Sequence, residues 1–263
     1  MDAASNLKLI SRVGIGLDSV DLLKAEKLDI AVSYTPDAPA PAVAELTVGM
    51  MLTLLRSVHV SNSQMHLGKW HRFFGKRLSE VTIGIIGIGR IGKGVLEHLK
   101  GFGNPKILVN DISIKDDINN KFNVKWSSKE EIYKKSDIVS LHLPLTGETK
   151  NMIKKNHLLS MKTDAIIINT SRGGIINESD LYEVMKSGHL SGAAIDVFNE
   201  EPYNGPLKEI ERCLLTAHMG SMSIDCRARM EIEATEEAVR FLTGKKLEGR
   251  VSEGEYEVQR RGL

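Results

Sequence analysis

The sequence has few cysteines, and this scarcity limits the compartments in which the protein would work. Only Cys213 and Cys226 are present among 263 residues, and their separation matches no metal-ligand spacing. A chain of this size with two thiols is not held together by a disulfide framework, and it suits a reducing compartment. We therefore expect a cytoplasmic protein with structural thiols and no bound metal.

A long hydrophobic run and an excess of charge of one sign are also missing. No apolar stretch approaches the roughly 18 residues of a membrane span, and the first residues lack the apolar core of a secretory signal. The formal net charge is +1, which gives no reason to expect nucleic acid or a membrane as a partner. The remaining composition, 41% hydrophobic and 26% charged, is that of an ordinary globular protein.

Short apolar segments alternate with longer helical segments over most of the chain. Several apolar segments are continuous and rich in β-branched residues, which is typical of parallel strands covered by helices on both faces. The expected strands are 7–13, 29–34, 81–87, 105–111, 136–143, 164–170, 191–198 and 213–218. The expected helices are 41–68, 91–103, 177–190 and 225–244. This alternation predicts an α/β fold with a doubly wound parallel sheet of the Rossmann type over 43–224, with residues 1–42 and 225–263 in a second lobe.

A glycine-rich turn follows the segment 81–87 and opens the helix expected from residue 91. Its glycines, Gly87, Gly89 and Gly92, have the GxGxxG spacing between an apolar strand and a helix. In that setting the first glycine allows a tight turn, the second lets the backbone approach a pyrophosphate, and the third lets helix and strand pack closely. Free N–H groups at the helix N-terminus favour the phosphate. The turn therefore predicts a dinucleotide site.

Asp111 ends the next expected strand, about 20 residues beyond the last of these glycines. A carboxylate at this place accepts hydrogen bonds from the adenosine ribose and repels the 2′-phosphate of NADP. We therefore predict NAD as the cofactor, with Lys115 weakening the repulsion slightly. His142, at the end of the segment 136–143, is a further candidate for the wall of the cofactor pocket.

Polar residues follow three later strands, at the carboxyl ends where open α/β sheets bind ligands. A hydride-transfer enzyme acting on a hydroxyl needs a cation for the substrate carboxylate, an acid–base group, and a neighbour that orients this group. Arg172 offers a bidentate fork, and His218 titrates near neutral pH. A glutamate beside the histidine, Glu200 or Glu201, would favour the imidazolium. Each residue alone is equally well explained as a structural group, but their joint placement favours catalysis.

Seven segments carry a family resemblance and follow one another along the chain. They are RVGIGLDSVD, YTPDAPAPAVAELT, GIIGIGRIG, LHLPLTGETKNMI, INTSRGGIINE, AAIDVFNEEP and LLTAHMGS, and they cover roughly residues 8–245. With them the chain resembles the D-isomer-specific 2-hydroxyacid dehydrogenases, particularly the phosphoglycerate-dehydrogenase-like members. The resemblance implies NAD-dependent interconversion of a D-2-hydroxy acid and its 2-oxo acid. The alternative is a non-catalytic NAD(H)-binding regulatory protein of the same fold.

The resemblance also implies roles for individual residues. Arg172 matches the arginine that holds the 2-oxo acid, and His218 matches the acid–base histidine. Glu201, directly before Pro202, matches the glutamate that partners the histidine, which leaves Glu200 as a solvated bystander. Asp196 matches an aspartate that contacts the nicotinamide carboxamide. The implied substrate residues are Arg12, Val13, Gly14, Arg172 and His218, and the cofactor candidates are Gly87, Gly89, Arg90, Ile91, Gly92, Asp111, His142, Pro144, Thr149, Thr170, Ser171, Asp196 and Gly220.

Two further expectations concern the second lobe and the assembly. Members of this family usually carry several dozen residues before the RVGIG segment, which here begins about ten residues from Met1. The resemblance therefore implies a truncated, flavodoxin-like substrate lobe. Residues 41–68 resemble the dimerisation segment of the family and imply a homodimer, the alternative being a buried interdomain helix. The substrate stays open among hydroxypyruvate, glyoxylate, pyruvate and 3-phosphoglycerate.

Overall fold

The computed structural model describes residues 1–260, and the chain divides into two compact units. Unit 1 contains Met1–Ala42, Leu145–Glu148 and the chain from Ser221 onward, and unit 2 contains Val43–Pro144 and Thr149–Gly220. The units differ from the expected division in the short segments 145–148 and 221–224, which belong to unit 1. Each unit is described by itself.

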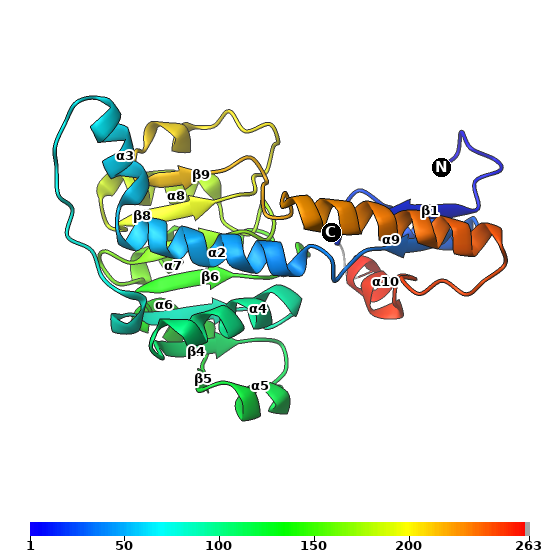
Figure 1. Ribbon diagram of the computed structural model, residues 1–263, viewed down its shortest axis with the longest axis horizontal. Helices are drawn as coiled ribbons and strands as arrows, with labels where there is room; N and C mark the ends of the chain where they lie inside the picture. Colours follow the sequence, from blue (N-terminus) through cyan, green and yellow to red (C-terminus); the bar gives the residue numbers. More distant parts are fainter. Residues whose placement is uncertain (261–263) are drawn as a thin grey trace. The chain divides into compact units, whose positions relative to one another are not determined.

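Unit 2 is built on a seven-stranded parallel sheet, drawn in Figure 1. The strand order is β5-β4-β3-β6-β7-β8-β9, so the chain winds outward from β3 in both directions. This order confirms the predicted Rossmann-type α/β fold, and it creates a switch point between β3 and β6, where such sheets bind ligands. The strands are β3 (Thr82–Ile86), β4 (Lys106–Asn110), β5 (Val124–Trp126), β6 (Ile138–Leu141), β7 (Ile166–Asn169), β8 (Gly192–Ile195) and β9 (Cys213–Leu215).

The helices of unit 2 explain why its central strands are buried along their whole length and, apart from Ser140 and Asn169, apolar. Every residue of β6, β7 and β8 is buried, because helices cover both faces of a doubly wound sheet. Burying one large aliphatic side chain contributes about 1.5–3 kcal/mol. The helical elements that lie in unit 2, wholly or for the most part, are α2 (Ala40–Leu55), α3 (Val58–His66), η1 (Leu78–Glu80), α4 (Arg90–Leu99), η2 (Lys100–Phe102), α5 (Asp116–Lys121), α6 (Lys129–Lys135), α7 (Lys155–Ser160), α8 (Glu178–Ser187) and η3 (Pro206–Glu209).

The expectation of one helix over 41–68 was wrong. The segment forms α2 and α3, which are bent by 64° at a break. Ser57, at the break, has a left-handed φ of 49°, which a continuous α-helix does not accommodate. By length and apolar composition this bent pair could cross a membrane, whereas no single helix among residues 1–260 could.

Strand β5 was missed by the sequence analysis. It has only three residues and lies at the edge of the sheet, where its side chains are exposed or half-buried. Its segment VKW therefore lacks the continuous apolar run that marks the central strands. The expected strands were also longer than those observed, because the residues flanking each strand belong to the turns.

Unit 1 is organised around a two-stranded parallel sheet of β1 and β2. Helix α9 contacts both strands, and α1 contacts α10. A small core of eight buried residues, including Leu22 and Val32, lies within this unit. The elements are β1 (Leu9–Arg12), α1 (Leu22–Lys27), β2 (Ala31–Tyr34), α9 (Ile224–Leu242) and α10 (Glu253–Arg260).

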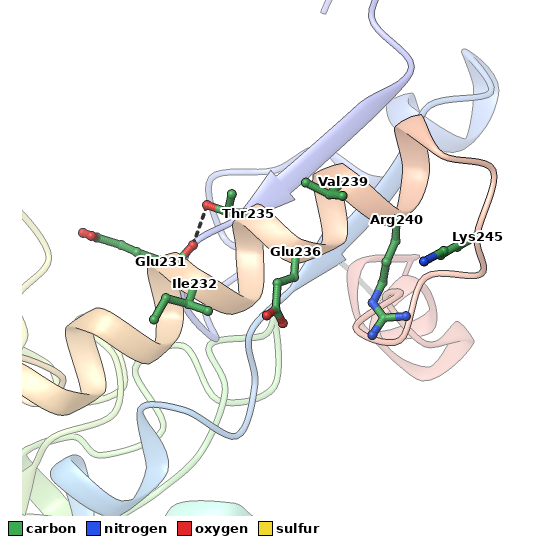
Figure 2. Close-up of a pocket in the computed structure, with 7 residues that line it drawn as sticks. All are labelled: Glu231, Ile232, Thr235, Glu236, Val239, Arg240 and Lys245. Atoms are coloured by element: carbon green, nitrogen blue, oxygen red, sulfur yellow. Dashed lines mark hydrogen bonds between the residues drawn. The ribbon is translucent and has the colours of Figure 1, made fainter.

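A shallow groove of about 530 Å³ runs along α9 and is shown in Figure 2. The side chains of α9 that line it lie on the face of the helix opposite its buried residues. The Thr235 hydroxyl donates a hydrogen bond to the Glu231 carbonyl at 2.7 Å. The groove contains none of the residues that the sequence analysis assigned to cofactor or substrate. It is lined by Glu231, Ile232, Thr235, Glu236, Val239, Arg240 and Lys245.

Candidate active site

Two of the three glycines in the loop between β3 and α4 are required by close backbone contacts, and the third faces open space. A Cβ atom on Gly87, whose φ is 96°, would lie 2.2 Å from the carbonyl oxygen of His142. A Cβ on Gly92 would lie 2.1 Å from the Gly87 carbonyl oxygen, whereas a Cβ on Gly89 would point into open space. Gly89 is the N-cap of α4, so bare backbone faces outward where the helix begins. These residues fit the pyrophosphate of a dinucleotide.

Asp111 follows β4 and is tied to the same loop. Its Oδ2 accepts hydrogen bonds from the Ile88 N–H at 2.6 Å and from the Lys115 ammonium at 2.9 Å. Burial acts to raise the pKa of Asp111, but the hydrogen bonds from Lys115 and Ile88 outweigh it and hold the pKa below its ordinary value. The carboxylate is therefore charged at neutral pH and repels a 2′-phosphate, while Lys115 offsets part of that charge.

His142 and Pro144 lie at the carboxyl end of β6, with Thr149 beside them. Nε2 of His142 lies 2.9 Å from the Ser140 hydroxyl, and burial lowers the pKa of His142 to about 4. The ring is therefore neutral at pH 7. The Thr149 hydroxyl donates to the Pro144 carbonyl at 2.7 Å, which closes the turn after the strand.

Asn169 organises the turn that carries Arg172, and the sequence analysis missed this residue. Its side-chain oxygen accepts hydrogen bonds from the Ser171 N–H at 3.1 Å and the Ser171 hydroxyl at 2.8 Å. Its amide nitrogen donates to the Arg172 carbonyl at 2.8 Å. The Thr170 hydroxyl lies 2.9 Å from that of Thr47 on α2. A buried amide at the end of an apolar strand was the available signal, since buried polar groups need partners.

Asp196 fixes the turn that carries His218. It directly follows β8, is only 1% exposed, and its carboxylate accepts hydrogen bonds from the Met219 N–H at 2.8 Å and the Gly220 N–H at 2.9 Å. The His218 N–H donates to the Asp196 carbonyl at 2.8 Å. His218 has a left-handed φ of 52°, a conformation that persists in a non-glycine residue only where its surroundings hold it. Nothing in the sequence indicated that Asp196 binds the backbone of Met219 and Gly220.

The imidazole of His218 contacts Glu201. Nδ1 of the ring lies 2.8 Å from Oε2 of Glu201, and the two side chains are 51% and 39% exposed. The other carboxylate oxygen, Oε1, accepts the Phe198 N–H at 3.1 Å. With Nδ1 engaged, Nε2 is the nitrogen left for proton transfer. Glu200 is exposed.

Arg172, Glu201 and His218 follow three neighbouring strands, β7, β8 and β9, at one edge of the sheet. The family model for the D-isomer specific 2-hydroxyacid dehydrogenase NAD binding domain matches residues 48–220. The chain belongs to this family. The match covers both the glycine loop and the turn of His218, and it confirms the predicted family, its NAD cofactor and its oxidoreductase chemistry on the CH–OH group. The non-catalytic alternative has no comparable support.

Other members of this dehydrogenase family are similar over most of the chain. A glyoxylate reductase of Thermofilum pendens is 37% identical over 254 residues, which are 93% of this chain and 75% of that protein. A hydroxypyruvate reductase of Thermotoga maritima is 38% identical over 251 residues, 92% of this chain and 80% of that protein. A D-lactate dehydrogenase of Aquifex aeolicus, solved with NAD and lactic acid, has a TM-score of 0.83 and 28% identity, covering 90% of this chain and 77% of that one.

The substrate residues that the family resemblance implies near the N-terminus belong to unit 1. Arg12 ends β1, and its guanidinium lies against Gly14, where a Cβ would meet Nη1 at 2.9 Å. The Gly14 N–H donates to the Thr35 hydroxyl at 2.8 Å, and the Thr35 N–H donates back to the Gly14 carbonyl at 3.2 Å. This reciprocal pair fixes the turn around Val13 and Gly14. Within residues 1–260, no three His, Cys, Asp or Glu side chains are grouped to hold a metal ion.

Proposed function

We propose that this dehydrogenase reduces a small 2-oxo acid, glyoxylate or hydroxypyruvate first among them, with His218 as the proton donor. The contact between His218 Nδ1 and Glu201 at 2.8 Å is the observation that supports it most directly. The names of the two relatives that are 37% and 38% identical support the substrate class.

The proposed mechanism assigns one task to each of three side chains. The Arg172 guanidinium binds the substrate carboxylate through its fork and so orients the carbonyl. When bound, NADH supplies the hydride that reduces the carbonyl carbon. His218, protonated, gives the proton on Nε2 to the carbonyl oxygen, and Glu201 stabilises the imidazolium until then. In the oxidative direction His218 takes the hydroxyl proton.

We assign the cofactor to unit 2. The glycine loop and the start of α4, Arg90 and Ile91, would hold the pyrophosphate, and Asp111 would hold the ribose. The Asp196 carboxylate would also reach the nicotinamide carboxamide, since a carboxylate has about four lone-pair sites. The remaining cofactor-wall candidates are His142, Pro144, Thr149, Thr170, Ser171 and Gly220. For unit 1, taken by itself as a flavodoxin-like substrate lobe, we propose that the Val13–Gly14 backbone and Arg12 have an affinity for carboxylates.

The function is tested by following NADH absorbance with glyoxylate, hydroxypyruvate, pyruvate and 3-phosphohydroxypyruvate in turn. We expect reduction of at least one unphosphorylated acid and weaker activity with NADPH, because the Asp111 charge opposes a 2′-phosphate. The matched measurement is NADH binding by fluorescence on the same preparation. Binding without reduction of any acid would contradict the enzyme proposal and favour a regulatory protein.

We also propose a cytoplasmic homodimer through the 41–68 region, and we extend the interface to the segment that follows it, up to Phe74. The supporting observation is a row of exposed apolar side chains, with Trp70 77% exposed and Phe74 fully so. Both cysteines are free and buried, and burial raises the pKa of Cys213 to about 12, which suits unreactive thiols in a reducing compartment. The exposed residues of the row are Val58, Met65, Leu67, Trp70 and Phe74.

Light scattering after size-exclusion chromatography tests the dimer. We expect twice the chain mass of 29.1 kDa for the wild type, and monomers for the double variant Trp70→Ser/Phe74→Ser, because apolar area drives association. Leu242→Ser removes an equally exposed apolar side chain from α9 and serves as the control. A monomeric wild type, or a dimeric double variant, would contradict the assignment.

A further inference from the structure

We propose that Glu178 is a positioning residue for proton transfer: its carboxylate fixes the turn that holds Glu201 against His218. This inference rests on the proposed function, because it takes His218 to be the proton donor. Glu178 is the first residue of α8, and all the residues concerned lie in unit 2.

Two successive backbone N–H groups bind two different carboxylates. The Phe198 N–H donates to Glu201 Oε1 at 3.1 Å, and the Asn199 N–H donates to Glu178 Oε1 at 2.7 Å. The first carboxylate is the one that contacts His218 through its other oxygen. The two successive peptide units that meet at Phe198 are therefore each held by one carboxylate, and Glu178 accepts the shorter of the two hydrogen bonds.

The surroundings leave this turn little freedom to reach another position. A Cβ on Gly173 would lie 1.9 Å from the Phe198 carbonyl oxygen, so the loop after Arg172 packs directly on the turn. On the other side the Phe198 ring stacks on Tyr203, with centroids 4.1 Å apart and planes 20° from parallel. Because Glu178 also begins the helix that follows the Arg172 loop, it joins that loop to the turn of Glu201.

The surroundings of Glu178 disfavour its charged form. Burial raises the pKa of Glu178, and the nearby charge of Glu200 raises it further, while the Asn199 N–H acts in the opposite direction. The other titratable groups around the turn are Glu201, His218 and the Tyr203 phenol. Burial raises the pKa of Tyr203, and the charge of Glu178 raises it further. A half-buried carboxylate beside another acid gains nothing as a solubilising surface charge. Its local gains are its place in the first turn of α8, where the helix dipole favours an acid, and the hydrogen bond to Asn199, whose N–H loses its acceptor when Glu178 is removed.

Three substitutions separate the position of the carboxylate from its charge. Glu178→Ala removes both, Glu178→Asp keeps the charge but withdraws the acceptor by one methylene, and Glu178→Gln removes the charge but keeps an acceptor oxygen. Glu183→Ala is the control on the same helix, since Glu183 makes an exposed ion pair with Lys155 at 2.6 Å. Glu201→Gln gives the reference for direct loss of the negative partner of His218.

Each variant is measured for kcat, KM, NADH affinity, melting temperature and the NMR titration of the His218 ring. For Glu178→Ala and Glu178→Asp we expect kcat to fall about tenfold at unchanged NADH affinity. The reason is that the proton donor His218 is still present but no longer held in the right position. In both, the ring should lose its proton at lower pH than in the wild type, toward the behaviour of Glu201→Gln. Glu178→Gln and Glu183→Ala should resemble the wild type.

The ring titration is carried out without substrate, so the inference and the proposed function fail separately. A wild type that reduces no 2-oxo acid defeats the function, whatever the titration shows. An unchanged titration in both Glu178→Ala and Glu178→Asp overturns the positioning role, as does a Glu178→Gln variant that loses as much activity as Glu178→Ala. If the alanine variant does not fold, the aspartate and glutamine variants still decide between these outcomes.

Discussion

Replacing His218 with alanine is expected to lower kcat for 2-oxo acid reduction by about 10³-fold, the scale of positioned acid–base catalysis. The carbonyl oxygen would then take its proton from water. NADH affinity should stay within about twofold of the wild type, because the glycine loop and Asp111 are untouched. Steady-state kinetics and NADH fluorescence titration on the same protein check both parts.

Two companion variants make the His218 result specific. His218→Gln keeps a side-chain donor for Glu201 and the shape of the turn but has no titrating proton, so it should be nearly as inactive as His218→Ala. His98→Ala removes a histidine from the last turn of α4 and should leave kcat unchanged. Comparable loss of NADH affinity and kcat in His218→Ala would instead indicate that the turn had collapsed, which the melting temperature would reveal.

The parts of the fold that the sequence predicted correctly are those in which local and global preferences agree. Strands β6, β7 and β8 are buried on both faces, so their positions are apolar apart from Ser140 and Asn169, and the pattern is strong. The glycine loop could also be predicted from the sequence, because Gly87 and Gly92 face carbonyl oxygens that exclude any side chain. The break at Ser57 had no such signature, since neither a glycine nor a proline marks it and only the backbone of this serine departs from the helix.

The candidate site also has a part that could be predicted from the sequence and a part that could not. The residue types and their places after consecutive strands were readable, because parallel strands bring their carboxyl ends to one edge. The choice of Glu201 over Glu200 came from the family resemblance, and its contact with His218 depends on a turn closed by the Phe198 N–H. The hydrogen bonds that Asp196 accepts from the turn of His218, and that Glu178 accepts from Asn199, join residues more than 20 positions apart and produce no periodic sequence pattern.

Replacing Arg172 with alanine is expected to lower kcat/KM for the 2-oxo acid by about 10²-fold, mostly through a higher KM, because the carboxylate loses its bidentate partner. Arg172→Lys keeps the charge but not the planar fork, so it should recover only part of this loss. The guanidinium donates to the Ser171 carbonyl at 2.7 Å, so a small loss of stability is also expected.

Saturation curves for the acid and for NADH distinguish a substrate anchor from a cofactor anchor. A substrate anchor raises KM for the acid while leaving the NADH dissociation constant unchanged, whereas a cofactor anchor would do the reverse and contradict the assignment. Arg229→Ala is the matched control, because Arg229 makes an exposed ion pair with Glu233 on α9 and such pairs contribute little. If Arg172 and His218 act on the same bound 2-oxo acid, kcat/KM of the double variant Arg172→Ala/His218→Ala should fall by less than the product of the two single losses. Without Arg172 the substrate is no longer oriented, so the proton donor His218 contributes less to its reduction.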